Sequence, residues 1–232
     1  MIRVIDFEAT GTEPDAAIVE VGWCDFLPAS RTIAGRGSYL CRVDAMPPQT
    51  RAIHHIRVAD TAGCAPYDRR CLYEDAMRAG AVALAAHSAD FEGRHIIGSL
   101  PLVCTYKAAL RVWPDAPAHG VFPLLYWLED QGTVEFDREA AMPPHRAGPD
   151  AYATAVLLQA IYMAGYEGSD LVRWTREPAF MTRCPIGAWR GHLWEEVETS
   201  MLEWIMWKAR DLGEDVRWNA QREYDRRTYG DE

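Results

Sequence analysis

Three short runs of the sequence carry side chains suited to metal-dependent chemistry. The first is Asp6-Phe7-Glu8, which lies at the end of an apolar segment predicted to be a strand over Ile2 to Phe7. Carboxylates two residues apart on a strand point to the same face, so Asp6 and Glu8 can share a cation. Magnesium and manganese are the ions that suit a site built from carboxylates.

The second run is Asp90-Phe91-Glu92, which repeats the same spacing. A third copy at positions 137–139 shows that the spacing by itself is weak, and a solvated acidic pair is the plain interpretation of an isolated copy. We predict that a helix begins near Asp90. Residues two apart on a helix point about 200° from each other, so only one of Asp90 and Glu92 can face a shared site.

The third run places His145 five residues before Asp150, at the start of a helix predicted over Pro149 to Ala164. The helix is indicated by apolar residues at i, i+4, i+7 and i+11, behind a proline suited to the first turn. The helix dipole alone also explains an acid at Asp150. Histidine is the side chain that ordinarily titrates nearest to neutral pH, so His145 is a candidate general base.

The periodicity of apolar residues predicts the elements that position these runs. The predicted strands are residues 2–7, 17–27, 37–43, 81–86 and 102–104. The predicted helices are residues 71–79, a segment starting near 90, and residues 106–112, 121–129 and 149–164. An opening antiparallel meander followed by alternating strands and helices predicts an α/β fold, with a mixed sheet and helices on both faces.

Composition indicates a globular protein with one main core and an appendage. The chain has 232 residues, of which 49% are hydrophobic. We expect one domain over residues 1–165 and an appendage over residues 166–232, where six of the nine tryptophans lie. The net charge of −10 argues against nucleic-acid binding by bulk positive charge. Acids gathered around cations still create a locally positive place for a phosphate.

The cysteines and the first residues indicate the compartment. The six cysteines are spaced too irregularly for a zinc clip or a small disulfide scaffold, which favours reduced thiols in a cytoplasm. Asp6 and Glu8 interrupt the segment where a signal peptide would be apolar, and no apolar run approaches about 18 residues. We therefore expect a cytoplasmic protein that does not contact a membrane.

In their joint order, the three runs resemble the motifs of the DEDDh (DnaQ-like) 3′-to-5′ exonucleases. The first motif of that family is matched by Asp6, Glu8, Thr10 and Gly11. The second reads His-Asn-Ala-x-Phe-Asp in the family, where this chain has His87, Ser88, Ala89, Asp90, Phe91 and Glu92. The third, His-x4-Asp followed by Ala, is matched by His145, Asp150 and Ala151. The resemblance covers residues 1–165.

Two further segments extend the resemblance. Residues 52–56 are similar to the Ile-His-x-Ile segment that lies beside the substrate strand in relatives. Residues 185–191 are similar to an element that follows the nuclease domain in the exonuclease X subgroup.

The resemblance implies a ribonuclease-H-like fold, followed here by a small Trp-rich helical appendage, and hydrolysis of phosphodiester bonds at nucleic-acid 3′ ends. It implies that nucleoside monophosphates are released, from DNA more than from RNA, with two Mg²⁺ or Mn²⁺ ions and a histidine base. The implied metal ligands are Asp6, Glu8 and Asp150 for one ion, and Asp6 with Glu92, or its rival Asp90, for the other. The implied general base is His145, and the implied substrate contacts are Thr10, Gly11, His54, His55 and Phe91.

Ser88 and Glu92 depart from the family pattern. The family phasing selects Glu92 over Asp90, but its side chain is one methylene longer than the expected aspartate. The alternative function is therefore a nucleic-acid-binding or polymerase-associated proofreading module with weakened catalysis. The expected partners are single-stranded or frayed 3′ ends, together with a polymerase under the alternative.

Overall fold

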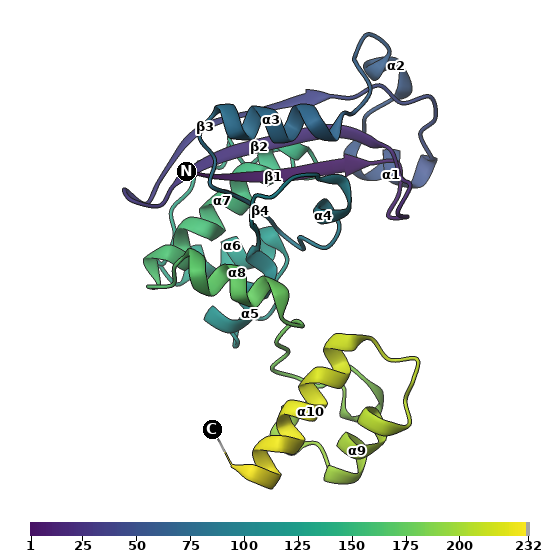
Figure 1. Cartoon of the computed structure of the whole chain (residues 1–232), viewed down its shortest axis with the longest axis vertical. Coiled ribbons are helices and arrows are strands. Elements are labelled where there is room, and N and C mark those ends of the chain that lie inside the picture. Colours follow the sequence, from purple (N-terminus) through teal and green to yellow (C-terminus); the bar gives the residue numbers. More distant parts are fainter. Residues whose placement is uncertain (231–232) are drawn as a thin grey trace.

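The computed structural model describes residues 1–230, and a five-stranded mixed sheet forms the centre of its first part (Figure 1). The strands are β1 (Ile2–Ala9), β2 (Ile18–Leu27), β3 (Thr32–Leu40), β4 (Ala83–Ala86) and β5 (Leu102–Cys104). Their order in space is β3-β2-β1-β4-β5. β1 pairs antiparallel with β2 and parallel with β4, so the predicted meander and mixed sheet are confirmed.

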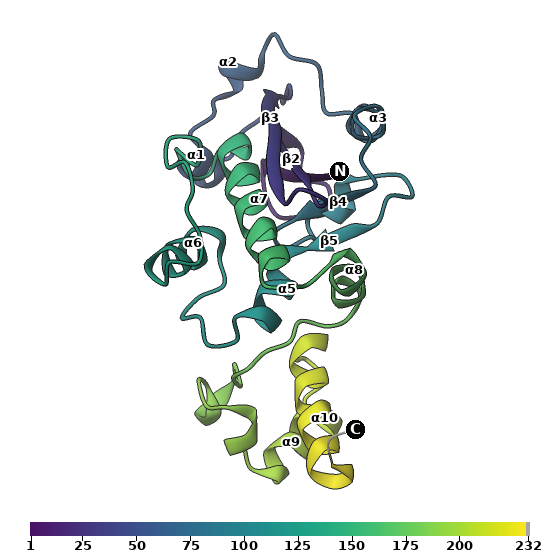
Figure 2. The ribbon, with the colours of Figure 1, turned by 90° about the vertical axis from the view of Figure 1, so that its left-hand side faces the viewer.

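Helices cover both faces of this sheet, with α3 on one face and α7 on the other (Figure 2). The helices that accompany the sheet are α1 (Pro48–His54), α2 (Val58–Thr61), α3 (Arg69–Arg78), α4 (Glu92–His95), α5 (Thr105–Val112), α6 (Val121–Asp130), α7 (Ala147–Met163) and α8 (Gly168–Arg176). Beyond them follow two short 3-10 helices, at Gly187–Trp189 and Trp194–Glu196. The last two elements are the α-helices α9 (Thr199–Trp207) and α10 (Glu214–Tyr229). Within residues 1–230, no helix combines the length and the apolar character needed to cross a lipid bilayer.

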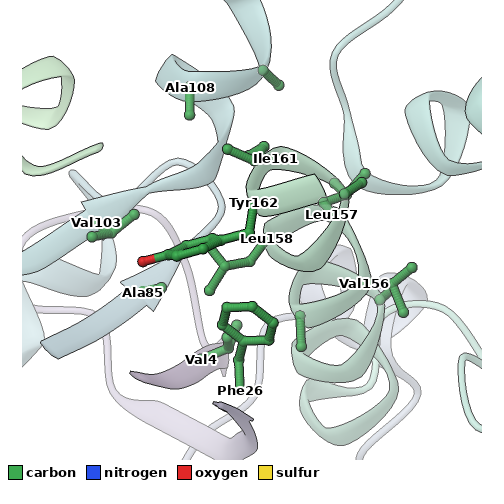
Figure 3. Packing of buried hydrophobic residues seen from close by; sticks show 14 of the residues in the cluster. Val4, Phe26, Ala85, Val103, Ala108, Val156, Leu157, Leu158, Ile161 and Tyr162 are labelled. Atoms are coloured by element: carbon green, nitrogen blue, oxygen red, sulfur yellow. The ribbon is translucent and has the colours of Figure 1, made fainter. Parts of the chain in front are cut away.

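The alternation of side chains along β1 feeds two separate apolar cores. Val4 packs with Phe26 of β2 and with Leu158 and Tyr162 of α7 in the larger core (Figure 3). Ile5 instead joins the core beneath α3. Each large aliphatic chain buried in this way contributes about 1.5–3 kcal/mol, so the two cores fix which face of β1 each residue presents.

This alternation also decides where the acidic end of β1 points. Asp6 and Glu8 continue the series begun by Ile2 and Val4, so both face α7 rather than α3. The strand therefore presents its two carboxylates to the helix that carries Asp150.

The third strand lies earlier in the chain than predicted, at Thr32–Leu40 rather than residues 37–43. Its two glycines explain the difference, because they make room for the indole of Trp23 on β2. A Cβ atom at Gly37 would lie 3.0 Å from that ring, and one at Gly35 would lie 3.4 Å from it. The strand thus carries glycines for packing reasons, although glycine in a sequence usually indicates a turn.

A smaller second unit follows the sheet domain, and α9 packs against α10 within it (Figure 1). Its own core contains Trp194, Leu202 and Ile205. Helix α8 does not belong to this unit, because its buried Leu171 and Trp174 pack in the larger core of the sheet domain. We therefore propose that the boundary between the two units follows α8 instead of lying at residue 165.

The segment that starts at the last residues of α8 is hydrogen-bonded to both units. On one side, Lys107 of α5 donates to the carbonyl oxygens of Thr175 and Glu177, at 3.1 and 2.9 Å. On the other side, Asp215 of α10 accepts the Ala179 N–H at 2.7 Å, and the buried Asn219 donates to the Ala179 carbonyl oxygen at 2.7 Å. Residues 175–181, called the connecting strap below, are therefore held at both ends.

Candidate active site

Three of the predicted acids meet at the end of β1. One carboxylate oxygen from each of Asp6, Glu8 and Asp150 lies within 4.8 Å of the other two. Asp6 and Glu8 come from the strand, and Asp150 comes from the first turn of α7. Three carboxylates at this separation, all partly buried, form the kind of oxygen-donor set that holds a divalent cation.

Burial and mutual repulsion raise the pKa values of this cluster. Burial raises the pKa of the Asp6 carboxyl well above its usual value, and neighbouring carboxylates, led by Asp150, raise it further. Burial, followed by the charge of Asp150, raises the pKa of Glu8 to about 8. Burial raises the pKa of Asp150 to about 7. Ionising all of these acids together is electrostatically unfavourable unless a positive charge lies among them.

Of the two second-motif acids, Glu92 is the buried one, and it lies close enough to Asp6 for its charge to act on that residue. Glu92 begins α4, is 4% exposed, and its charge contributes to the raised pKa of Asp6. Burial raises the pKa of Glu92 itself to about 8. Its rival Asp90 is exposed and lines a polar hollow with Lys107 and Arg176, on the side of the second unit. The structure thus brings Glu92 toward the cluster and leaves Asp90 outside it.

The cluster fits a cation by a further criterion, the state of its hydrogen bonds. Asp150 Oδ1 and Glu92 Oε2 are buried and have no hydrogen-bond partner among the described residues. Buried polar atoms are normally paired, so each exception calls for a missing ligand or water. Carboxylate oxygens in this position suit Mg²⁺ or Mn²⁺ better than softer metals.

His145 lies on the loop directly before α7. Its backbone N–H donates to Asp150 Oδ2 at 3.2 Å, and its side chain is exposed. Its φ of +59° is the left-handed conformation, which is uncommon for residues other than glycine. The chain therefore turns sharply at His145, so that this residue lies beside the acid five positions later.

Two residues beside the cluster were not singled out from the sequence. Glu20 of β2 is paired in register with Glu8, and it accepts two hydrogen bonds from the Arg146 side chain, each at 2.8 Å. The sequence did hold one signal, since Glu20 is an acid inside the apolar run Ile18–Val21. An acid at such a place is buried and needs a partner.

The residues predicted to contact substrate lie around the same end of the sheet, some with structural tasks of their own. Thr10 closes the turn between β1 and β2, because its side-chain oxygen accepts the Ala17 N–H at 3.0 Å. Gly11 follows it in that turn, and a Cβ atom there would lie 2.2 Å from the Glu13 carboxylate. Phe91 is partly buried, with its ring centre 5.0 Å from that of His95.

The two adjacent histidines differ in their surroundings. His54 is 2% exposed, its Nδ1 accepts the Ile56 N–H at 3.0 Å, and its Nε2 is buried without a partner among the described residues. Burial lowers the pKa of His54. His55 is exposed and ends α1 in the left-handed conformation, with φ of +59°.

The second motif begins with two residues that shape its loop. His87 is held by Thr105 and by the His119 carbonyl oxygen, at 3.0 and 2.8 Å, and burial lowers its pKa to about 4. Ser88 has φ of +65°, a conformation that asparagine adopts more readily than serine. Ser88 stands where the family motif has that asparagine.

The fold is that of solved DEDDh 3′-exonucleases, which agrees with the resemblance predicted from the sequence. Among solved structures, exonuclease X in complex with 5′-overhanging duplex DNA is similar to it. That similarity has a TM-score of 0.60 and 28% sequence identity, over 75% of this chain and 99% of the other.

Two other solved structures share the fold at lower identity. The nuclease domain of 3′hExo, a DEDDh family member bound to rAMP, has 16% identity and a TM-score of 0.55, over 71% of this chain and 92% of that one. Escherichia coli exonuclease I in complex with a dT13 oligonucleotide has 12% identity and a TM-score of 0.53, over 70% of this chain and 41% of that one. No protein-family model and no curated protein matches the sequence.

Proposed function

We propose that the protein is a divalent-metal-dependent 3′-to-5′ exonuclease, which hydrolyses the terminal phosphodiester at a nucleic-acid 3′ end and releases nucleoside monophosphates. The observation that carries this proposal is the convergence of Asp6, Glu8 and Asp150 within 4.8 Å at the end of the central strand. The proposed substrate is DNA in preference to RNA, taken as a single-stranded or frayed 3′ end in the cytoplasm.

The acids are proposed to hold two Mg²⁺ or Mn²⁺ ions. Asp6, Glu8 and Asp150 would hold one, and Asp6 with Glu92 the other. When bound, the ions would supply positive charge against the phosphate and make a water molecule easier to deprotonate. Buried oxygens of Asp150 and Glu92, which have no hydrogen-bond partner within residues 1–230, support this assignment.

His145 is proposed to accept the proton of the attacking water on an imidazole nitrogen. Support comes from its place directly before α7, where its own N–H is bonded to Asp150. A neutral imidazole can take a proton near pH 7, whereas the surrounding carboxylates are proposed to be occupied by cations.

The terminal nucleotide is proposed to lie against the β1–β2 turn and α1. Thr10 and Gly11 follow Glu8 two and three residues later in the sequence, and the glycine allows a close approach to the backbone. His54 and His55 are proposed to contact the substrate strand. The Nε2 atom of His54, which has no hydrogen-bond partner in the described part of the chain, supports a contact by that residue. Phe91 is proposed to pack against the substrate at the edge of the second motif.

The test is a digestion ladder of 5′-labelled DNA and RNA oligonucleotides, run with Mn²⁺ and with a chelator. The wild-type protein should shorten the strand stepwise from its 3′ end only when the ion is present. Asp6→Ala should abolish shortening, because it removes the residue shared by both proposed ions. Asp115→Ala, a change of an acid in the turn after α5, is the matched control and should leave the ladder unchanged.

Two outcomes would count against the proposal. Wild-type rates for Asp6→Ala, or shortening that persists in chelator, would end the assignment of the acids. Binding of the oligonucleotide in a gel shift without shortening in Mn²⁺ would favour the alternative, a weakened binding or polymerase-associated module. The observation behind that alternative is the longer acid Glu92 together with Ser88 in the second motif.

A further inference from the structure

An ion pair joins the second strand to the start of the helix that carries Asp150. Arg146 Nε and Nη2 donate to the two carboxylate oxygens of Glu20, each at 2.8 Å. The Glu20 side chain is only 2% exposed, and that of Arg146 is 37% exposed. A planar guanidinium that meets both oxygens of a carboxylate fixes direction as well as distance.

Glu20 also binds the backbone of the helix. Its Oε2 accepts the N–H of Ala147, the first residue of α7, at 3.1 Å. The first N–H groups of a helix have no partner within the helix, and an acid placed there is favoured by the helix dipole. Glu20 Oε1 thus accepts a hydrogen bond from Arg146, and Oε2 accepts from both Arg146 and Ala147. Glu20 therefore differs in task from Glu8, its neighbour in the strand register.

The surrounding packing leaves little freedom at this junction. A Cβ atom at Gly22 of β2 would lie 1.8 Å from the Ala147 carbonyl oxygen, and one at Gly148 would lie 3.2 Å from Ser38. The start of α7 therefore lies directly on the backbone of β2. The Glu20–Arg146 pair adds an ion pair between β2 and the residue that precedes α7.

Arg146 lies in the chain between His145 and Asp150, the two third-motif residues of the proposed site. Arg146 directly follows His145, and its carbonyl oxygen accepts the Asp150 N–H at 3.0 Å. Asp150 in turn accepts the His145 N–H at 3.2 Å. These bonds make residues 145–150 one closed unit, and the side chain of Arg146 anchors that unit to the sheet.

We propose that Glu20 and Arg146 are positioning residues, which hold residues 145–150 at the correct place against the acids of β1. This inference rests on the proposed exonuclease function, since it concerns the placement of the base and of one metal ligand. The partners behind metal ligands commonly contribute 10- to 100-fold to metal affinity or activity.

The experiment compares Arg146→Lys, Glu20→Gln and the double variant with the wild-type protein. Mn²⁺ binding is measured by titration calorimetry, and kcat and KM are measured on a 5′-labelled single-stranded DNA. Either single variant should weaken Mn²⁺ binding and lower kcat by roughly 10- to 100-fold, with KM changed less than threefold. The double variant should be no worse than the poorer single variant, because the two residues act through each other.

Arg3→Lys is the matched control. Arg3 of β1 forms an equally short two-bond pair with Asp25 of β2, the strand that also carries Glu20. The control should lower the melting temperature and leave Mn²⁺ affinity and kcat within twofold. Should Arg146→Lys fail to fold by circular dichroism, Glu20→Gln keeps the side-chain shape and carries the test.

The outcomes separate this inference from the proposed function. An active wild-type protein whose variants keep wild-type Mn²⁺ affinity and kcat would overturn the positioning role alone. Equal losses in Arg3→Lys would do the same, because any buried pair would then have the same effect. A wild-type protein that binds Mn²⁺ but never shortens DNA would overturn the exonuclease function, and the Mn²⁺ affinities of the variants would still decide the positioning role.

Discussion

At the scale of single residues, the site is defined by an electrostatic conflict. Asp6, Glu8 and Asp150 bring three carboxylates within 4.8 Å, and burial and repulsion raise their pKa values. A folded chain tolerates such repulsion where a bound cation relieves it. His145 differs from the acids, because its side chain is exposed beside them rather than buried among them.

His145→Ala should separate proton transfer from metal binding. We expect kcat to fall by roughly 10²- to 10⁴-fold, the usual contribution of a general base. Mn²⁺ affinity should stay within about threefold of wild type, because the hydrogen bond from His145 to Asp150 is donated by the backbone N–H, which alanine keeps. Titration calorimetry and single-turnover kinetics measure the two quantities. A parallel loss of Mn²⁺ affinity and kcat would contradict the role of a base.

Glu92→Gln and Asp90→Asn form a matched pair of charge-removing changes two residues apart. Glu92→Gln should lower kcat by at least about 10²-fold, because the charge of this buried acid acts on Asp6. The kcat of Asp90→Asn should stay within about threefold of the wild-type value, because the Asp90 side chain is solvated outside the cluster. The digestion ladder, quantified over time, measures both rates. The reverse ranking would make Asp90 the second-motif acid.

At the scale of elements, the site depends on the contact between β2 and α7. Gly22 lies opposite Asp6 in the strand register, and its missing side chain lets the start of α7 rest on the strand. The same contact brings Asp150 to the end of β1. A substitution that moves the start of α7 away from β2 would therefore displace Asp150, although no acid of the site is itself replaced.

Gly22→Ala should lower both stability and activity. The added Cβ atom would meet the Ala147 carbonyl oxygen at 1.8 Å, and overpacking of this kind costs about 1–3 kcal/mol of unfolding free energy or more. Gly63→Ala is the control, because nothing lies within 4 Å of its added atom, and its effect should stay within about 0.5 kcal/mol. Urea denaturation measures both changes. A Gly22→Ala protein as stable and active as wild type would show that the contact is not rigid.

The sequence allows the elements of the site to be placed well, because local patterns determine them. The helix predicted over Pro149 to Ala164 is observed at Ala147–Met163, since proline and apolar periodicity mark its course. The start of β3 was missed, because Gly35 and Gly37 indicate a turn until the neighbouring Trp23 is known. Long-range packing decides that case.

The candidate acids could be selected from the sequence only through their joint order, because the spacing of each pair is common by chance. The pairing of Glu20 with Arg146 could not be predicted, for a related reason. They are 126 residues apart in the chain, and no local pattern links them. Pairing across the sheet is a property of the fold.

At the scale of the whole molecule, the carboxylates couple stability to pH and to metal. The folded pKa values of Glu8, Asp150 and Glu92 are about 8, 7 and 8, above their unfolded values. The folded state therefore binds more protons than the unfolded state between about pH 4 and 8. The contribution of these groups to stability is present at low pH and is lost as the pH rises through that window.

We expect Mn²⁺ to reverse this loss. The melting temperature of the wild-type protein should rise on adding Mn²⁺, and the rise should be larger at pH 8 than at pH 6, because protons compete with the ion for the acids. Differential scanning fluorimetry in both buffers measures the shift. Asp6→Asn is the control, since it should stabilise the metal-free protein at pH 8 and remove most of the Mn²⁺ effect. An equal Mn²⁺ shift in Asp6→Asn would contradict this account.

The connecting strap has a consequence for the way the two units work together. Lys107 of α5 is hydrogen-bonded to the beginning of the strap, and Asp215 and Asn219 of α10 are hydrogen-bonded to Ala179. Few residues of the strap lie between these two sets of bonds. The strap is therefore a hydrogen-bonded connection and not a flexible linker. Moving the second unit away from α5 would therefore break hydrogen bonds within residues 175–181, so the strap opposes separation of the two units.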